Sequence, residues 1–100
     1  MQLIPVTVEA DQRFSVTMVG QRVSLRLRYN TLIDRWSVSV SIDDEPLLDG
    51  RRMTLNRNAF VGVLDNLGSL FLYSETVVDP NFDNVSDGTV KLYHADPDEV

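Results

Sequence analysis

Apolar and polar residues alternate with a period of two in three successive segments of the first half of the chain. The segments are Phe14–Met18, Val23–Tyr29 and Trp36–Ile42, and Ser, Thr or Arg stands between their apolar residues. This period predicts strands with one face in a core and one face in water, as in antiparallel sheets. The breaks at Gly20–Gln21 and Asn30–Asp34 have the length of hairpin connections, so the three strands are predicted to form a meander.

One further strand is predicted on each side of this meander. Ile4–Val8 repeats the alternation, and Pro5 within it has no backbone N–H, which indicates an edge strand or the start of a strand. Leu47–Met53 follows a turn and is predicted to be a short bent strand with a bulge or a tight turn at Asp49–Gly50.

The second half of the chain is predicted to hold two strands separated by loops. Thr54–Asn66 has apolar residues near helical spacing but also glycine and asparagine, so we expect a loop with one helical turn. Leu70–Thr76 is apolar on both faces, which predicts a central strand. Asp79–Gly88 has turn-forming residues at almost every position and is predicted to be a long polar loop, and Thr89–Ala95 is the last strand.

Together these segments predict an all-β fold. We expect a small antiparallel β-sandwich or barrel of about seven short strands with at most one short helical turn. A length of 100 residues fits one domain. Residues 1–95 are predicted to form this single β-domain, and residues 96–100 a flexible acidic C-terminal tail.

Composition excludes several classes of protein. The chain is 43% hydrophobic and 24% charged, which is typical of a globular domain rather than a disordered one. No segment approaches the roughly 20 apolar residues of a membrane span, and the first five residues have no basic start, so we expect no signal peptide. The absence of cysteine excludes disulfides, thiolate zinc sites and a thiol nucleophile.

The net charge of −6 is concentrated at the C-terminal end. Residues 1–74 hold eight arginines and eight acids, whereas residues 75–100 hold seven acids and Lys91. An acidic surface of this kind repels nucleic acid and anionic lipid. We therefore expect neither nucleic acid nor a membrane among the partners.

No set of residues predicts a catalytic site or a cofactor. His94 is the chain's only histidine, shares a strand face with Val90 and Leu92, and is predicted to be a hydrogen-bonded structural residue. Trp36 lies in phase with the core positions of its strand. It is predicted to be a core anchor whose indole N–H reaches a backbone carbonyl, with stacking on a ligand as the alternative.

Acidic residues at short spacing raise the question of a calcium site. The spacing in the segment that starts at Asp79 resembles the start of an EF-hand loop, but the glycine and glutamate that such a loop requires are absent. We therefore predict no metal site, and the residues that a looser calcium site would use are Asp79, Asp83 and Asp87. The alternative for these three is a solvated acidic loop.

Arginines gather on the polar face of the meander and next to it. Arg22, Arg26 and Arg28 share one strand face, and Arg51 and Arg52 follow in a neighbouring strand. The aromatic residues nearby are in phase with the core, which argues against binding of single-stranded nucleic acid. These five arginines are therefore predicted to form an interface with an acidic surface of a second copy or a partner. The alternative for them is a plain solvated surface.

The order of landmarks along residues 12–95 resembles that of a family of short bacteriophage tail proteins encoded among baseplate genes. The landmarks are strand and turn motifs at characteristic spacings: Phe14-x-Val16-x-Met18-x-Gly20, Leu25-x-Leu27-x-Tyr29-Asn30, Trp36, Ile42-Asp43, Pro46-Leu47-Leu48-x-Gly50, Gly68-x-Leu70-Phe71, Asp79-Pro80 and Asp87-Gly88-x-Val90-x-Leu92-Tyr93.

The resemblance implies a non-enzymatic structural protein of a phage tail, associated with the baseplate or hub and present in several copies around the tail axis. Its partners would be tube, hub or wedge proteins and further copies of itself, and its location would be the virion after assembly in the host cytoplasm. The family carries no catalytic residues that could be transferred to this chain. The alternative is a small carbohydrate- or calcium-binding β-module that uses Trp36 or the acidic loop.

Overall fold

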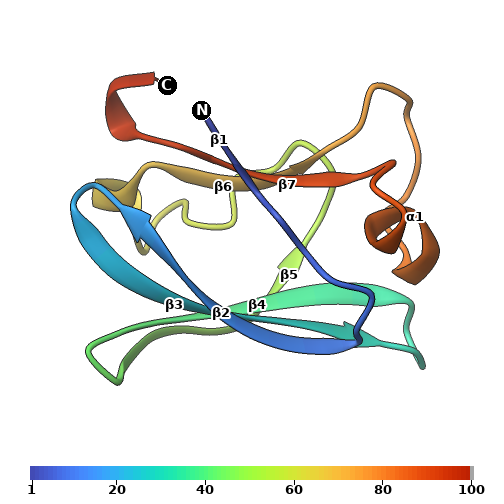
Figure 1. Cartoon of the computed structure of the whole chain (residues 1–100), viewed down its shortest axis with the longest axis horizontal. Coiled ribbons are helices and arrows are strands. Elements are labelled where there is room, and N and C mark those ends of the chain that lie inside the picture. Colours follow the sequence, from blue (N-terminus) through green and yellow to red (C-terminus); the bar gives the residue numbers. More distant parts are fainter. Residues whose placement is uncertain (100) are drawn as a thin grey trace.

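The computed structural model describes residues 1–99 and consists mainly of two antiparallel sheets (Figure 1). The larger sheet has the order β2-β3-β4-β5 and the smaller one β1-β7-β6. The strands are β1 (Gln2–Ile4), β2 (Asp11–Met18), β3 (Gln21–Asn30), β4 (Arg35–Ile42), β5 (Glu45–Met53), β6 (Ser69–Tyr73) and β7 (Lys91–Ala95). The sheets form two layers and no closed barrel, so the all-β prediction is confirmed as a sandwich.

The predicted three-stranded meander is confirmed as β2-β3-β4, and β5 continues it. Strands β2 and β3 are joined at Val19 and Gly20, which both have positive φ, one residue before the predicted turn. Strands β4 and β5 are joined at Asp43 and Asp44, also at positive φ. Two-residue turns of this kind match the twist of the flanking strands. The predicted bend of β5 is confirmed by register shifts opposite Val38–Ser41.

The smaller sheet differs from the prediction in which strand is central. Strand β7 lies between β1 and β6, so Leu70–Thr76 is not a central strand. The free edge of β6 is instead covered by the segment before it, where Asn56 N–H donates to the Leu72 carbonyl and Ala59 N–H to the Leu70 carbonyl, both at 2.7 Å. Strand β6 is apolar on both faces because Leu70 and Leu72 are buried in the core, whereas Phe71 and Tyr73 point to the outer side.

The N-terminal strand is shorter than predicted. It covers Gln2–Ile4 rather than Ile4–Val8, because the chain leaves β7 at Pro5, which cannot donate to the ladder. The chain then crosses from the smaller sheet to the start of β2 in the larger one (Figure 1). Gln12 holds this crossover, since its Nε2 donates to the carbonyls of Thr7 and Glu9 and its Oε1 accepts from Thr7 N–H.

The predicted long loop contains a helix, α1 (Phe82–Ser86). Its start is capped reciprocally, because Asn81 Oδ1 accepts from Asn84 N–H and Asn84 Oδ1 accepts from Asn81 N–H, both at 2.8 Å. Phe82 and the buried Val85 pack the helix on the core. The prediction that Asp79–Gly88 is entirely a loop was wrong, because a helix of five residues is too short to show a helical period in the sequence.

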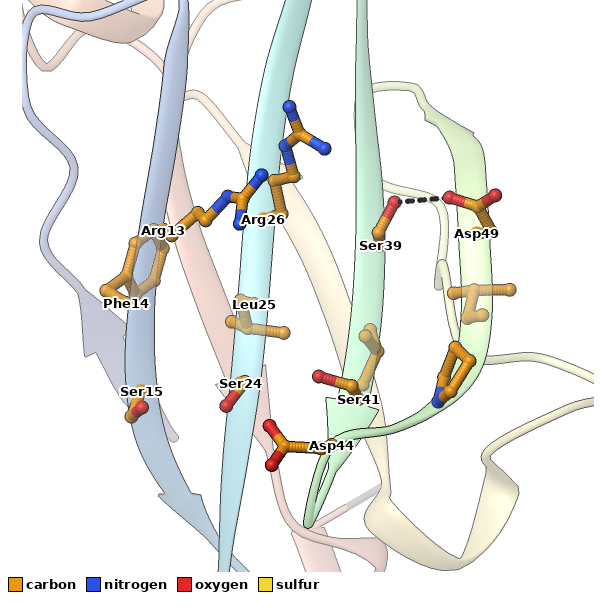
Figure 2. Close-up of a pocket in the computed structure, with 13 residues that line it drawn as sticks. Arg13, Phe14, Ser15, Ser24, Leu25, Arg26, Ser39, Ser41, Asp44 and Asp49 are labelled. Carbon is orange, nitrogen blue, oxygen red and sulfur yellow. Dashed lines mark hydrogen bonds between the residues drawn. The ribbon is translucent and has the colours of Figure 1, made fainter.

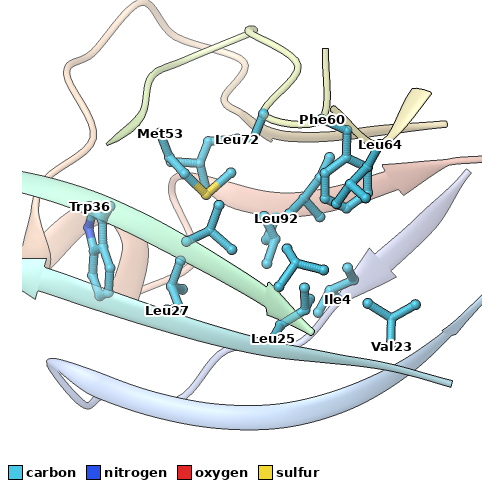
Figure 3. Close-up of a cluster of buried hydrophobic side chains, with 14 of the residues drawn as sticks. Ile4, Val23, Leu25, Leu27, Trp36, Met53, Phe60, Leu64, Leu72 and Leu92 are labelled. Atoms are coloured by element: carbon cyan, nitrogen blue, oxygen red, sulfur yellow. The ribbon is translucent and has the colours of Figure 1, made fainter. Parts of the chain in front are cut away.

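The core lies between the two sheets (Figure 3). Figure 3 shows Leu25 and Leu27 from the larger sheet facing Leu72 and Leu92 from the smaller one. Near α1 the core contains the rings of Tyr29, Trp36 and Phe82. The large, fully buried side chains of the whole core include Trp36, Phe60, Ile4, Met18, Leu27, Leu67, Leu70, Leu72 and Leu92.

The remaining segments are irregular. Residues 54–68 form turns that end in a 3₁₀ turn at Asp65–Leu67, close to the predicted loop with one helical turn. A second 3₁₀ turn covers Pro97–Glu99. The flexible acidic tail at 96–100 stays a prediction, and Val100 lies outside the described residues. Within residues 1–99, no helix is long and apolar enough to cross a membrane.

Candidate functional site

The outer face of the larger sheet carries arginine and serine because of the alternation in β2, β3 and β4. The strand register places Arg13, Arg26 and Ser39 side by side in one row across the three strands. The next row holds Asp11, Arg28, Ser37 and Arg52. Since the side chains between these positions point into the core, the polar groups share one solvent-facing surface.

One ion pair orders part of this surface. Arg26 binds Asp11 through two hydrogen bonds, Nε to Oδ1 at 3.0 Å and Nη2 to Oδ2 at 2.7 Å. The hydrogen bond from Arg26 holds the pKa of the Asp11 carboxyl below its ordinary value, and the same bond raises the pKa of Arg26. Because Arg13 stands opposite Arg26, the pair also offsets a repulsion between like charges on neighbouring strands.

Four of the five arginines predicted to form an interface share this face, and the fifth does not. Arg22, Arg26, Arg28 and Arg52 lie on it. Arg51 is paired with the buried Val38, and its Nη1 donates to the carbonyls of Ala59 and Val61 at 2.9 and 2.8 Å. Arg51 thus fastens the irregular segment to β5, on the side of the strand that faces inward.

A shallow open groove of about 470 Å³ crosses this face. Its floor includes Ser15, Ser24 and Ser41, which lie in one row on three neighbouring strands (Figure 2). The floor is low because serine side chains are small, and the arginines stand higher at one end. In the same row as Arg13 and Arg26, Ser39 Oγ donates to Asp49 Oδ1 at 3.0 Å, as the dashed line in Figure 2 marks.

The outer face of the smaller sheet is aromatic, which the sequence analysis missed. Phe71, Tyr93 and Leu3 stand in one row across β6, β7 and β1, with Tyr73 beside them. The Phe71 and Tyr93 rings stack at 6.0 Å between centroids, and Tyr73 meets Tyr93 edge-on at 6.2 Å. Leu3 is 51% exposed and Tyr73 42%. The signal was available, because these residues alternate out of phase with the buried positions of their strands.

The acidic residues considered for calcium do not converge. Asp79 precedes α1, Asp83 lies in it and Asp87 follows it. Asp87 accepts a hydrogen bond from Thr89 N–H at 2.8 Å, and hydrogen bonding to Thr89 lowers the pKa of this carboxyl. Among the residues that the structure describes, no group of three or more His, Cys, Asp or Glu could hold a metal ion.

His94 and Trp36 both have structural positions, as predicted. His94 is 1% exposed, and its Nε2 donates to the Leu67 carbonyl at 2.6 Å. Trp36 is also 1% exposed, and its Nε1 donates to the Asn81 carbonyl at 3.0 Å. Its ring lies 5.1 Å from Tyr29 and 6.2 Å from Phe82 between centroids. The indole is therefore enclosed and does not present a face for stacking on a ligand.

Comparison with protein families gives a match over residues 1–97 to the family described as cyanophage baseplate Pam3 plug gp18. The match covers the arginine and serine face, the aromatic face and α1. A comparison with curated proteins finds no match. The resemblance to phage tail and baseplate proteins, which rested on the order of strand and turn motifs, is thereby confirmed.

Proposed function

The chain belongs to the family of the cyanophage baseplate plug Pam3 gp18, and on this premise we propose that it is itself a plug component of a phage baseplate. The observation that carries the proposal is the family match over residues 1–97. Membership supports a structural role in the baseplate and a location in the tail of the virion. The chain would reach that location by assembly in the host cytoplasm.

We propose further that several copies are arranged around the tail axis, close to the hub, and that they contact other baseplate proteins. The two outer faces of the sandwich support contacts with different kinds of surface. The aromatic face offers tyrosine and phenylalanine, which are enriched at the centres of protein interfaces. The arginine face offers charge that guides orientation more than it adds affinity.

The role is non-enzymatic in this proposal and needs no cofactor. The proposal is supported by three side chains of types that acid–base chemistry uses, each of which already has a hydrogen-bond partner. The single histidine donates a buried hydrogen bond to a backbone carbonyl. Asp11 and Asp87 are held in the ionised form by hydrogen bonds, which does not suit a general acid near neutral pH.

Deletion of the gene from its phage tests the proposed function. We expect the deletion to stop production of infectious particles at tail assembly, so that lysates contain heads and incomplete tails, and we expect the wild-type chain supplied in trans to restore them. An unchanged yield of infectious particles with complete tails would contradict a structural role in the baseplate.

A further inference from the structure

Each sheet of the sandwich ends in two strand edges, and in the described part of the chain three of the four are protected. The edge of β6 is covered by the segment that bonds to Leu70 and Leu72. Strand β5 carries Pro46 and a break in register. Strand β1 has three residues and is followed by Pro5. Proline, bulges, short length and a covering segment are the usual ways in which proteins prevent edge-to-edge association.

The edge of β2 has none of these four protections, and its only charged residues are Asp11 and Arg13. The strand has eight residues, runs opposite β3 without a register shift, and contains no proline, glycine or lysine. No strand among residues 1–99 pairs with its outer side. It is therefore the longest regular edge that the molecule leaves open.

The backbone groups that β2 leaves unpaired can be identified from the turn. In a two-residue hairpin the flanking residues, here Met18 and Gln21, form a hydrogen-bonded pair, and such pairs alternate along the ladder. The bond from Tyr29 N–H to the Ala10 carbonyl at 2.7 Å agrees with this alternation, because Ala10 lies an even number of positions before Met18. The even-numbered residues of β2 thus bond to β3, and the odd-numbered residues from 11 to 17 direct N–H and C=O groups outward.

The side chains of the same strand leave apolar surface at this edge. Phe14 and Val16 point towards the core but are only half-buried, whereas Val23 and Leu25 opposite them on β3 are fully buried. A strand added to β2 would cover the exposed parts of Phe14 and Val16. Backbone pairing and apolar burial would therefore act together at this edge.

We propose that a second copy of the chain binds here, with its β2 antiparallel to this β2 and a twofold axis at Phe14. The two four-stranded sheets then form one continuous sheet of eight strands. Self-pairing requires that the odd-numbered residues bond to one another, and this register meets the requirement. It places Arg13 opposite Ser15 of the second copy and Asp11 opposite its Thr17.

The residues at the axis favour this register over its neighbours. Phe14 faces Phe14 of the second copy in a non-hydrogen-bonded pair, where side chains are closest and aromatic pairs stabilise a sheet. Moving the axis to Arg13 brings two arginines face to face, and moving it to Ser15 replaces the aromatic pair by Phe14 against Val16. Only the register centred on Phe14 joins the rings and separates the charges.

The proposal concerns two copies of the chain and does not depend on the role in the baseplate. An isologous pair is a closed unit, and such pairs can be arranged around an axis as single copies can. Pairing would also join the two arginine and serine faces into one surface, because both belong to the extended sheet.

Sedimentation of the purified chain tests the pairing, with two substitutions of one residue. We expect the wild-type chain and Ser15→Ala to form dimers of two 11.3 kDa chains as concentration rises. Ser15→Pro removes an outward N–H while leaving the bonds to β3, so it should remain monomeric with an unchanged circular dichroism spectrum. A wild-type chain that is monomeric up to about 1 mM, or Ser15→Pro dimers as stable as the wild type, would overturn the proposal.

Cross-linking tests the register, because the chain has no cysteine and an introduced one is unique. Under mild oxidation a mixture of Arg13→Cys and Ser15→Cys should give a disulfide-linked heterodimer, since residues 13 and 15 of the two copies face each other within the distance that a disulfide spans and Phe14 stays at the axis. Ser15→Cys alone is the matched control and should remain unlinked, because its cysteine lies opposite residue 13 of the second copy. Equal cross-linking in the two samples, or none in the mixture, would overturn the register.

Discussion

Gly68 stands where no other residue fits, at the end of the 3₁₀ turn that leads into β6. Its φ is +93°, and a Cβ at this position would overlap the Ala95 carbonyl oxygen of β7. We expect Gly68→Ala to lower the free energy of unfolding by more than about 2 kcal/mol, since backbone strain and a clash with main chain add. Urea denaturation measures the change.

The matched control for Gly68 is another glycine at positive φ with open space around it. Gly50 has φ +65°, and a Cβ at this position would have no atom within 4 Å beyond those of its chain neighbours. Gly50→Ala should therefore cost only the left-handed backbone conformation, about 1 kcal/mol. Equal losses for the two variants would contradict the close approach of Gly68 to β7.

The Asp11–Arg26 pair gives stability a defined dependence on pH. The pKa of Asp11 is lowered in the folded state, so the unfolded chain binds protons more readily. The stabilisation is complete above the ordinary pKa of 3.8 and is lost as the pH falls through the lowered pKa. We expect Asp11→Asn to reduce the loss of stability on acidification below about pH 4, as measured by thermal unfolding at a series of pH values.

Asp87 is a second carboxyl whose titration should affect stability in acid, and Asp11→Asn leaves it in place. Its pKa is also lowered, by hydrogen bonding to Thr89, and it lies far along the chain from Asp11. Acid sensitivity should therefore be reduced but not abolished in Asp11→Asn. If the variant and the wild type lose stability in parallel as the pH falls, Asp11 makes no contribution through its ion pair.

At the scale of elements, α1 depends on its cap and supports Trp36. Asn84 accepts from Asn81 N–H and donates to the Asp79 carbonyl, and the Asn81 carbonyl accepts from the indole. We expect Asn84→Ala to cost about 1 kcal/mol and to shift tryptophan emission to longer wavelength, because the indole loses its enclosure. Unfolding followed by tryptophan fluorescence measures both the loss of stability and the emission wavelength, since Trp36 is the only tryptophan.

The exposed Asp83, which lies in the same helix, provides the comparison. Its side chain takes no part in the reciprocal cap, so Asp83→Ala should change stability by a few tenths of a kcal/mol. Emission should stay at the wild-type wavelength. A spectral shift as large as that of Asn84→Ala would show that the cap is not what holds the indole.

The elements that the sequence predicts best are those with a strict period. Strands β2, β3 and β4 alternate without exception over their central residues, and their order and turns follow. Helix α1 has too few residues for a period, and an asparagine pair rather than Ser/Thr with Glu caps it. Counting alternate residues along β5 could not predict the face on which Arg51 lies, because the register shift changes which side chains point outward.

The whole molecule presents two outer faces of different chemistry, and sequence reasoning found only one. The arginines of β3 are separated by core residues, which makes their common face easy to recognise. Phe71 and Tyr73 lie in the segment Leu70–Thr76, which is apolar on both faces and was therefore predicted to be a central strand, and no role was predicted for Tyr93. Their exposure became visible only when the sheet order placed them in one row.

The arginine face is predicted to be an interface, and charge reversal tests it. We expect Arg28→Glu with Arg52→Glu to reduce incorporation into particles by about tenfold, because like charges would then meet an acidic partner surface. Incorporation is measured by competition with the wild-type chain during infection. The two side chains lie in one row, on either side of Ser37.

Arg57→Glu controls for the reversal of an arginine charge outside this face. Arg57 is exposed in the irregular segment between β5 and β6, away from the outer face of the larger sheet. We expect this variant to be incorporated as well as the wild type. Normal incorporation of the double variant would mean that the arginine face is not an interface in the particle.

Quantitative mass spectrometry of purified phage particles tests whether the chain is a component of the baseplate. A baseplate component should be present in intact particles at a small, fixed number of copies and should follow the tails when heads and tails are separated. We expect this result, and the number of copies would indicate the symmetry of the assembly. Absence from intact particles, with abundant free chain in the same lysate, would contradict a role in the baseplate.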